Sequence, residues 1–122
     1  MVLSGKPGAA MIDHDMRPGL NYLPSHFDRA RQEQLVADLR AAITVAPLFT
    51  PVMPRTGKPF SVRMTNLGPL GWVSDRAGYR YQATHPDMGK PWAPMPEVLL
   101  DLWRKVSGYD HPPEACLLNY YT

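Results

Sequence analysis

The spacing of apolar residues predicts a helix in the first half of the chain. After Asp28 they recur at intervals of three and four, the spacing of one helical face, while charged residues fall elsewhere. The apolar positions are Leu35, Leu39, Ala42 or Ile43, and Ala46. Asp28 suits the N-cap because its carboxylate accepts amide hydrogens, and Phe27 can pack onto the first turn. Pro47 ends the helix.

Alternation of apolar and polar residues predicts two strand regions. Over residues 60–65 the apolar positions are Phe60, Val62 and Met64, as in a half-buried strand, and the Pro- and Gly-rich residues 51–59 before it form a surface loop or flap. Residues 71–73 and 79–81 read as a hairpin around a five-residue connection, residues 74–78, whose Gly78 can adopt a positive φ. This hairpin brings Trp72 close to the two tyrosines.

A second helix and a last strand follow. In the segment 94–97 proline suits a first turn, where no amide donor is needed, and Glu97 complements the helix dipole; Gly108 ends the helix. One helical face carries Met95, Leu99, Leu102, Trp103 and Val106, which we assign to the core. Residues 116–121 are a continuous apolar run, typical of a strand covered on both sides.

Composition indicates one small, loop-rich globular domain. The chain has 122 residues, with 14 prolines and nine glycines spread among hydrophobic runs. We expect residues 1–19 to be a flexible segment, with 9–12 its only candidate strand, and residues 20–122 to form the domain. The net charge of +2 neither demands nor excludes a polyanion, so any nucleic-acid contact is local. The single cysteine, Cys116, excludes an internal disulfide and a thiolate zinc site, and the thiol reads as an inert core group.

We predict neither a membrane span nor export. No stretch approaches the ~18 apolar residues of a membrane span. Polar residues interrupt the N-terminus before an apolar signal core develops. These features predict a cytoplasmic protein.

Several ordered motifs carry a family resemblance. Met64-Thr65-Asn66-Leu67-Gly68-Pro69-Leu70-Gly71-Trp72 is followed by Asp75-Arg76-Ala77-Gly78-Tyr79-Arg80-Tyr81 and by Gly89-Lys90-Pro91-Trp92-Ala93-Pro94-Met95-Pro96. Together they resemble the nucleotide-recognition segment of AlkB-type dioxygenases, iron(II)- and 2-oxoglutarate-dependent enzymes that oxidatively remove alkyl groups from DNA or RNA bases. Pro113-Glu114-Ala115-Cys116-Leu117-Leu118-Asn119-Tyr120-Tyr121 is similar to the strand that enters their catalytic barrel.

The resemblance implies a substrate-binding cluster. Trp72 is similar to the family's substrate-stacking aromatic, and an indole that stacks on an extruded base contributes ~1–3 kcal/mol per base. The alternative is a core tryptophan. Tyr79, Arg80 and Tyr81 resemble a second set of substrate contacts, with the tyrosines on one side of their strand and Arg80 on the other; the alternative is simple sheet packing. Arg76 is a candidate phosphate contact or a solvated turn residue.

The resemblance also implies a 2-oxoglutarate site. Asn119, Tyr120 and Tyr121 are similar to the family's Asn-x-Tyr contact to that cofactor. Asn119 and Tyr121 share one side of the strand, where an amide and a phenol offer uncharged hydrogen bonds to a dicarboxylate, while Cys116 and Leu118 face the core. The alternative is a buried polar pair bonded to nearby backbone.

Two His-x-Asp sequences invite an iron assignment, and we reject both. Such a site needs His-x-Asp on one strand, a distant second histidine and open positions. His26-Phe27-Asp28 lies at a helix start, where Asp28 is better explained as a cap, and His85-Pro86-Asp87 lies in a proline turn. His111 is the only later histidine. In the family the iron ligands follow the Asn-x-Tyr strand, so we assign no metal ligand and no catalytic residue here.

The leading interpretation is the front part of an AlkB-like dealkylase. The expected fold class is α+β, with N-terminal helices packed on the opening strands of a double-stranded β-helix (jelly-roll), incomplete at the C-terminus. The complete enzyme would use Fe(II) and 2-oxoglutarate on alkylated single- or double-stranded DNA, with RNA as an alternative, and we expect a monomer that is inactive as this chain alone. The other interpretations are a standalone nucleic-acid-binding module and a small metalloenzyme using His85, Asp87 and His111.

Overall fold

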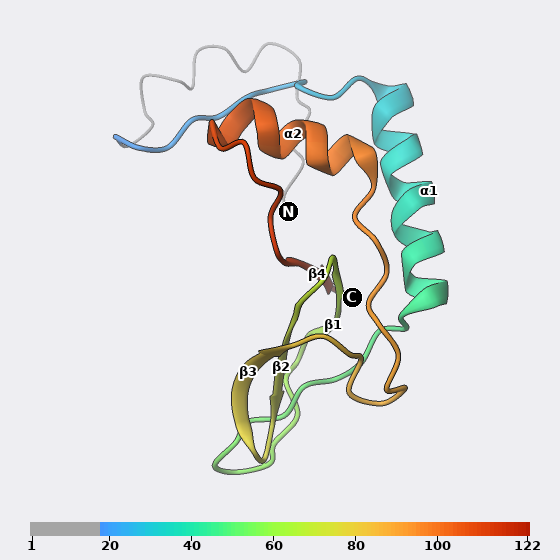
Figure 1. Ribbon diagram of the computed structural model, residues 1–122, viewed down its shortest axis with the longest axis vertical. Coiled ribbons are helices and arrows are strands. Elements are labelled where there is room, and N and C mark those ends of the chain that lie inside the picture. The colour runs from blue at the N-terminus through green and yellow to red at the C-terminus, as the bar shows by residue number, and fades with distance from the viewer. Residues whose placement is uncertain (1–17) are drawn as a thin grey trace.

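The computed structural model describes residues 18–122 and contains two helices and four strands (Figure 1). They follow in the order α1 (Arg29–Val45), β1 (Arg63–Leu67), β2 (Gly71–Asp75), β3 (Gly78–Gln82), α2 (Glu97–Ser107) and β4 (Cys116–Tyr120). The predicted strand at residues 9–12, and most of the predicted flexible segment 1–19, lie outside the described residues. Within residues 18–122 neither helix has the length and apolar character needed to cross a membrane.

The strands form two antiparallel pairs. β1 pairs with β4, from Arg63 opposite Tyr120 to Leu67 opposite Cys116, and β2 pairs with β3, from Gly71 opposite Gln82 to Asp75 opposite Gly78. The predicted α+β class is therefore confirmed. These pairs do not by themselves make a double-stranded β-helix, which stays a prediction.

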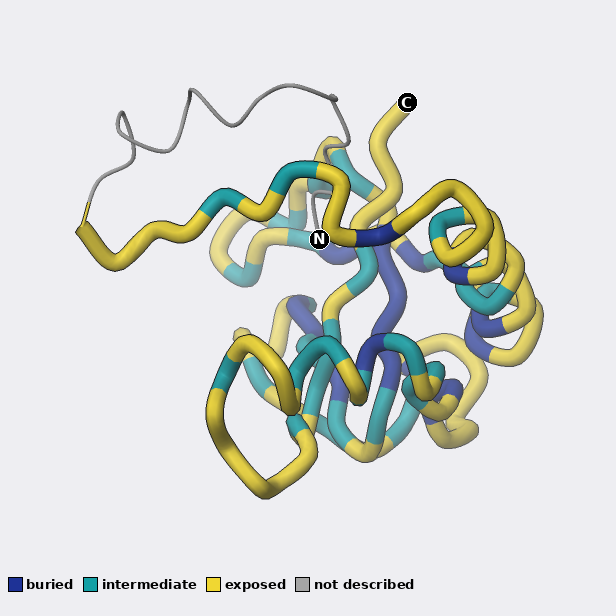
Figure 2. The backbone as a smooth tube through the Cα atoms, turned by 90° about the horizontal axis from the view of Figure 1, so that it is seen from above, coloured by how far each residue is buried: buried dark blue, intermediate teal, exposed yellow. Residues whose placement is uncertain are grey.

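Two apolar clusters hold these elements together. The first joins α1, β1 and α2 through Phe27, Leu35, Ala42, Leu67, Ala93 and Leu99. The second joins the end of α1 to the strands through Ala46, Phe49, Met64, Val73 and Trp92. Figure 2 shows the buried positions in the middle of the molecule and the exposed ones around its periphery. The helices thus pack on one side of the strands and the β2–β3 hairpin projects from the other end (Figure 1).

Helix α1 begins and ends as predicted. The Asp28 carboxylate accepts a hydrogen bond from the Arg31 amide at 2.8 Å, which satisfies a donor of the first turn. Phe27 is buried and its carbonyl accepts from the Gln32 side chain at 2.8 Å. The helix ends at Val45, with Ala46 as its C-cap.

Helix α2 also has its predicted ends, but its apolar face is narrower than predicted. Gly108 caps it in the left-handed conformation, with φ of 72°. Leu99 is buried, whereas Val106 is 57% exposed and Trp103 is only partly buried, so both core assignments were wrong. The Trp103 indole instead donates to the His111 carbonyl at 2.8 Å and stacks on Tyr109, which fixes the segment after the helix.

The first strand lies later than predicted and is buried on both sides. β1 starts at Arg63, and its next four residues are buried. Simple alternation fails because one side of the strand faces the helices and the other faces the second cluster. Phe60 and Val62 precede the strand and are partly buried.

The hairpin turn is tighter than predicted. Only Arg76 and Ala77 lie between the paired residues Asp75 and Gly78, because β2 continues to Asp75. The Asp75 carboxylate accepts the Ala77 amide at 2.8 Å, and Gly78 has the predicted positive φ, at 115°. Arg76 and Ala77 have no positive φ, so Gly78, the residue that follows them, is the one that supplies it, as in hairpins where a left-handed glycine follows the turn.

The loop at 51–59 packs on the hairpin, whereas β4 is more open than predicted. Val52 exchanges hydrogen bonds with Ser74, its amide donating to the Ser74 carbonyl at 3.1 Å and its carbonyl accepting from the hydroxyl at 2.6 Å. In β4, Leu117 is 38% and Tyr120 is 44% exposed, so the prediction of a strand covered on both sides was wrong for the described structure. The reason is that β4 pairs with β1 alone.

Candidate functional site

A pocket of about 450 Å³ opens between the hairpin and the β1–β4 sheet. Each of the four strands contributes at least one side chain to its wall, although the strands belong to separate sheets. The lining residues are Phe60, Val62, Met64, Asn66, Trp72, Tyr81, Ala115, Leu117 and Asn119. The pocket therefore brings a predicted substrate residue, Trp72, and a predicted cofactor residue, Asn119, to one cavity.

Strand alternation explains which side chains reach this pocket. In the β1–β4 register Met64 lies opposite Asn119 and Asn66 lies opposite Leu117, so these four share one side of the sheet. Cys116 lies on the other side, packed against the helical cluster. The predicted division of β4 is thus confirmed for Asn119 on the pocket side and Cys116 on the core side, whereas Tyr121 is not among the residues that line the pocket.

The hairpin presents an aromatic surface. Trp72 and Tyr81 are opposite each other in the register, and Tyr79 stacks on the Trp72 indole with ring centroids 5.7 Å apart and an interplanar angle of 20°. Trp72 is partly buried, whereas Tyr79 and Tyr81 are 63% and 62% exposed. Tyr79 does not line the pocket, so the part of the indole that faces the cavity is a part that Tyr79 does not cover. The predicted proximity of Trp72 and the tyrosines is confirmed; base stacking stays a prediction.

Arg80 lies away from this aromatic surface. Its guanidinium binds Asp75 with two hydrogen bonds, of 2.8 and 2.7 Å, and also donates to the Gln82 side chain and the Gly78 carbonyl. This pairing lowers the pKa of Asp75 to about 2, chiefly through the hydrogen bond from Arg80 and then that from the Ala77 amide. The structure therefore separates Arg80 from the tyrosines and commits its donors to holding the turn.

The predicted 2-oxoglutarate residues divide between the two sides of β4. The Asn119 amide lies 3.4 Å from the Tyr121 hydroxyl, to which it can donate, so these two are brought together. Tyr120 lies on the opposite side, with the Arg63 guanidinium 5.1 Å from its ring centroid. An amide and a phenol can both donate to a carboxylate, which is the predicted cofactor chemistry, but only Asn119 lines the pocket, and Tyr121 is 75% exposed. The structure does not bring Tyr120 to them.

The imidazole of His85 is fully used in hydrogen bonds. Its Nδ1 accepts from the Asp87 and Met88 amides at 3.1 and 3.3 Å, which makes Nε2 the protonated nitrogen that donates to the Pro47 carbonyl at 2.7 Å. The ring is 2% exposed and packs beside Phe49 and Trp92. A buried histidine with both nitrogens occupied has no lone pair free for a metal.

Across residues 18–122, no three histidine, cysteine, aspartate or glutamate side chains gather as a metal would require. Asp28 acts as the N-cap of α1, as the sequence predicted. The residues present therefore do not fit an iron ion, and no catalytic step can be derived from them.

Cys116 is the only cysteine, and it lies in the helical cluster. Partial burial raises the pKa of its thiol, which disfavours the thiolate. This environment agrees with the predicted unreactive core thiol.

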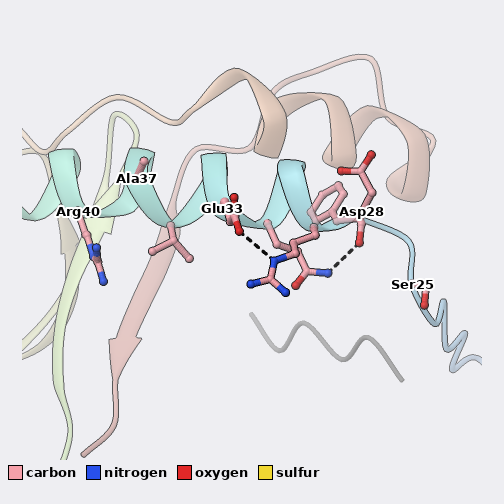
Figure 3. Close-up of a pocket in the computed structure, with 9 residues that line it drawn as sticks. Ser25, Asp28, Glu33, Ala37 and Arg40 are labelled. Atoms are coloured by element: carbon pink, nitrogen blue, oxygen red, sulfur yellow. Dashed lines mark hydrogen bonds and ion pairs between the residues drawn. The ribbon is translucent and has the colours of Figure 1, made fainter. Parts of the chain in front are cut away.

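A larger hollow, of about 820 Å³, lies along the outer side of α1 (Figure 3). Four of its nine lining residues are charged, including the exposed Arg29–Glu33 ion pair at 3.0 Å. Asp28, Glu33 and Arg40 lie along it on successive parts of the helix (Figure 3). None of the predicted site residues lines this hollow.

Sequence reasoning missed Asn66 as a site residue. Its side chain is buried, lines the pocket and forms two hydrogen bonds with the backbone of Trp72. The available signal was an amide between Thr65 and Leu67 at the end of a predicted strand. A buried amide needs partners, so such a residue marks a specific contact.

Residues 19–122 match the sequence profile of the 2OG-Fe(II) oxygenase superfamily, so the chain belongs to that superfamily. Within it the chain is AlkB-like. It is 45% identical over 104 residues to the alpha-ketoglutarate-dependent dioxygenase AlkB homolog of Caulobacter vibrioides, covering 85% of this chain and 47% of that protein. It is 40% identical over 93 residues to the alpha-ketoglutarate-dependent dioxygenase AlkB of Escherichia coli, covering 73% of this chain and 43% of that protein. The chain thus spans about half the length of these relatives.

Proposed function

We propose that this chain forms the substrate-recognition part of an AlkB-like dioxygenase that oxidatively dealkylates bases in DNA, with RNA as the alternative substrate. Trp72, Tyr79 and Tyr81 would bind the nucleotide, and Asn119 and Tyr121 would bind 2-oxoglutarate. The observation that carries the proposal is the pocket shared by Trp72 and Asn119. A dealkylase must hold its base and its cofactor in one cavity, so that the alkyl carbon meets the activated oxygen.

The distribution of charge supports a polyanionic substrate. Between Asp38 and Asp87 the only acidic residue is Asp75, and Arg80 neutralises it, whereas six residues in the same stretch are basic. Arg76 at the hairpin turn and the exposed Lys58 in the adjoining loop belong to this stretch. Positive charge beside aromatic side chains is typical of proteins that bind single strands, and Arg76 and Lys58 are the basic residues of this stretch that could supply it at the hairpin.

In the complete enzyme, iron and 2-oxoglutarate supply the oxidising chemistry. This chain would position the base against an aromatic wall and would offer uncharged hydrogen-bond donors to the cofactor. We infer that Arg80 supports the turn, because its donors are already used. A monomeric state and a cytoplasmic location stay predictions.

The test is binding of a single-stranded oligonucleotide that carries a methylated base. Trp72→Ala should weaken binding by ~1–3 kcal/mol, because a stacking platform is lost. The matched control is Trp103→Ala, since that indole is also partly buried and stacked on a tyrosine, but lies on α2 away from the pocket. The control should leave affinity unchanged.

A denaturation curve for each variant separates the alternatives. A core tryptophan replaced by alanine costs ~3–5 kcal/mol of folding free energy, and we expect Trp72→Ala to lose less because the ring is partly exposed. A still-folded Trp72→Ala with a large stability loss and unchanged affinity would place this residue in the core. That result would remove the proposal.

The binding-module alternative needs the same aromatic surface but no oxidation. The two proposals predict the same affinities and differ in whether the full-length protein releases succinate from 2-oxoglutarate. The metalloenzyme interpretation loses its support because the nitrogens of His85 are occupied.

A further inference from the structure

Asn66 forms a two-point contact with the backbone of Trp72. Its Nδ2 donates to the Trp72 carbonyl at 3.1 Å, and its Oδ1 accepts from the Trp72 amide at 3.0 Å. Only one orientation of the amide satisfies both bonds, so the geometry itself assigns the nitrogen and the oxygen. The side chain is 0% exposed, hence neither bond competes with solvent.

This contact lies between the two sheets. β1 pairs only with β4, and β2 pairs only with β3, so no strand ladder joins the sheet that carries Asn119 to the hairpin that carries Trp72. The Asn66 side-chain amide bonds to the Trp72 backbone in the way that a residue of a neighbouring strand would, with one donor and one acceptor. It bonds to the backbone of the one residue whose indole lines the pocket from β2.

We propose that Asn66 is a positioning residue, which fixes the Trp72 indole at the pocket through the Trp72 backbone and thereby sets the affinity for the base. The expected effect on affinity rests on the proposed function. The positioning itself is measurable without any ligand.

The first measurement is the indole N–H spectrum of the 122-residue chain. Its three tryptophans give three signals, and Trp72→Phe identifies that of Trp72. Asn66→Asp keeps the shape and the acceptor but replaces the donor by an oxygen facing the Trp72 carbonyl. We expect it to shift and broaden the Trp72 signal while that of Trp103 stays in place.

The matched control is Thr65→Val. Thr65 is the neighbouring residue of β1, is also 0% exposed, and donates to the Ala46 carbonyl at 2.8 Å, on the helix side of the strand. Valine keeps its shape and removes one buried hydrogen bond without touching the hairpin. The control variant should lose stability but keep the Trp72 signal.

The second measurement is affinity for the methylated single strand. Asn66→Asp should weaken binding about fivefold or more, the lower end of the effect of losing a stacking platform, whereas Thr65→Val should leave it unchanged. If Asn66→Asp does not fold, Asn66→Ser, which cannot span both backbone groups and adds no charge, replaces it in both measurements.

The outcomes separate this inference from the proposed function. An unchanged Trp72 signal in a folded Asn66 variant overturns the positioning role. If an Asn66 variant shifts the Trp72 signal but keeps full affinity, while Trp72→Ala loses affinity, then the positioning by Asn66 does not set the affinity for the base. A displaced signal with no oligonucleotide binding by the wild type supports positioning and removes the proposed function.

Discussion

Gly71 lies directly against the Trp92 indole, so closely that a Cβ atom at position 71 would come 2.2 Å from Cε2 of that ring. Trp92 is 5% exposed, and its indole donates to the Gln82 carbonyl at 2.9 Å, which holds the ring in place. The contact joins two of the motifs that identified the family, one ending in Gly71-Trp72 and the other centred on Trp92. The glycine is required here by close approach and not by a positive φ.

Gly71→Ala should therefore destabilise the fold by ~1–3 kcal/mol, as overpacking of a filled core does. Denaturant unfolding of this variant, of Trp92→Leu and of the double variant gives the coupling between the sites. Because leucine removes the ring that the methyl group would strike, the alanine should cost less in the Trp92→Leu background. Additive losses would show that the indole is not what forbids a side chain at position 71.

The Asp75–Arg80 pair should make stability depend on pH in the acid range. The pKa of Asp75 is lowered from its usual 3.8 to about 2 in the fold, so folding favours its ionised form. Its contribution is present above pH 3.8 and is lost as the pH falls through about 2. Asp75→Asn should flatten this part of the profile, measured by unfolding across that range. Equal pH profiles for wild type and variant would contradict the pairing.

Cys116 should react slowly with a thiol reagent in the folded protein. Burial raises the pKa of its thiol, so less thiolate is present at mildly alkaline pH than in an unfolded chain. Alkylation rates with and without denaturant give the comparison, and the denatured sample should react faster. Equal rates would mean that the helical cluster does not protect this cysteine.

The affinity for single strands should fall with salt, and Arg76 should account for part of the slope. Arg76→Ala removes one candidate phosphate contact, which should reduce the slope of log affinity against log salt by ~0.7. Arg29→Ala is the control, since Arg29 is equally charged and exposed but pairs with Glu33 on α1. A change of slope in the control alone, or in neither variant, would argue against a cationic turn that binds phosphate.

The chain by itself should not turn over 2-oxoglutarate with iron and a methylated oligonucleotide. The physical reason is that residues 18–122 hold no gathered set of three metal-ligating side chains. Succinate release measured against a no-protein sample checks this. Oxygen-dependent release above that background would overturn it, and single substitutions of the candidate ligands would then locate the metal: His26, Asp28, His85, Asp87 and His111.

Local patterns in the sequence predicted much of the fold. The ends of both helices depend on capping by Asp28 and Gly108, and these are interactions between residues near in the chain. The hairpin and the Trp72–Tyr79 stack follow from a short turn between two alternating strands. Asn119 and Tyr121 were expected on one side of β4, and the period of a strand is enough to put them there.

Other features depend on contacts between segments that lie far apart in the sequence. The sequence did not predict that Arg80 pairs with Asp75, and the proposed positioning role of Asn66 depends on how two sheets meet. Val106 has helical spacing like that of Leu99, yet only Leu99 meets another element. Periodicity tells which residues share a face; it does not tell whether anything covers that face.

The sequence by itself determined the AlkB-like family, the helix ends, the hairpin and the alternation of β4, because motifs, caps and strand period are local properties of the chain. Only the tertiary structure brought Trp72 and Asn119 to one pocket, placed Gly71 under Trp92 and used both nitrogens of His85. Burial and hydrogen bonding between distant segments are properties of the packed molecule, since they depend on what stands opposite each side chain.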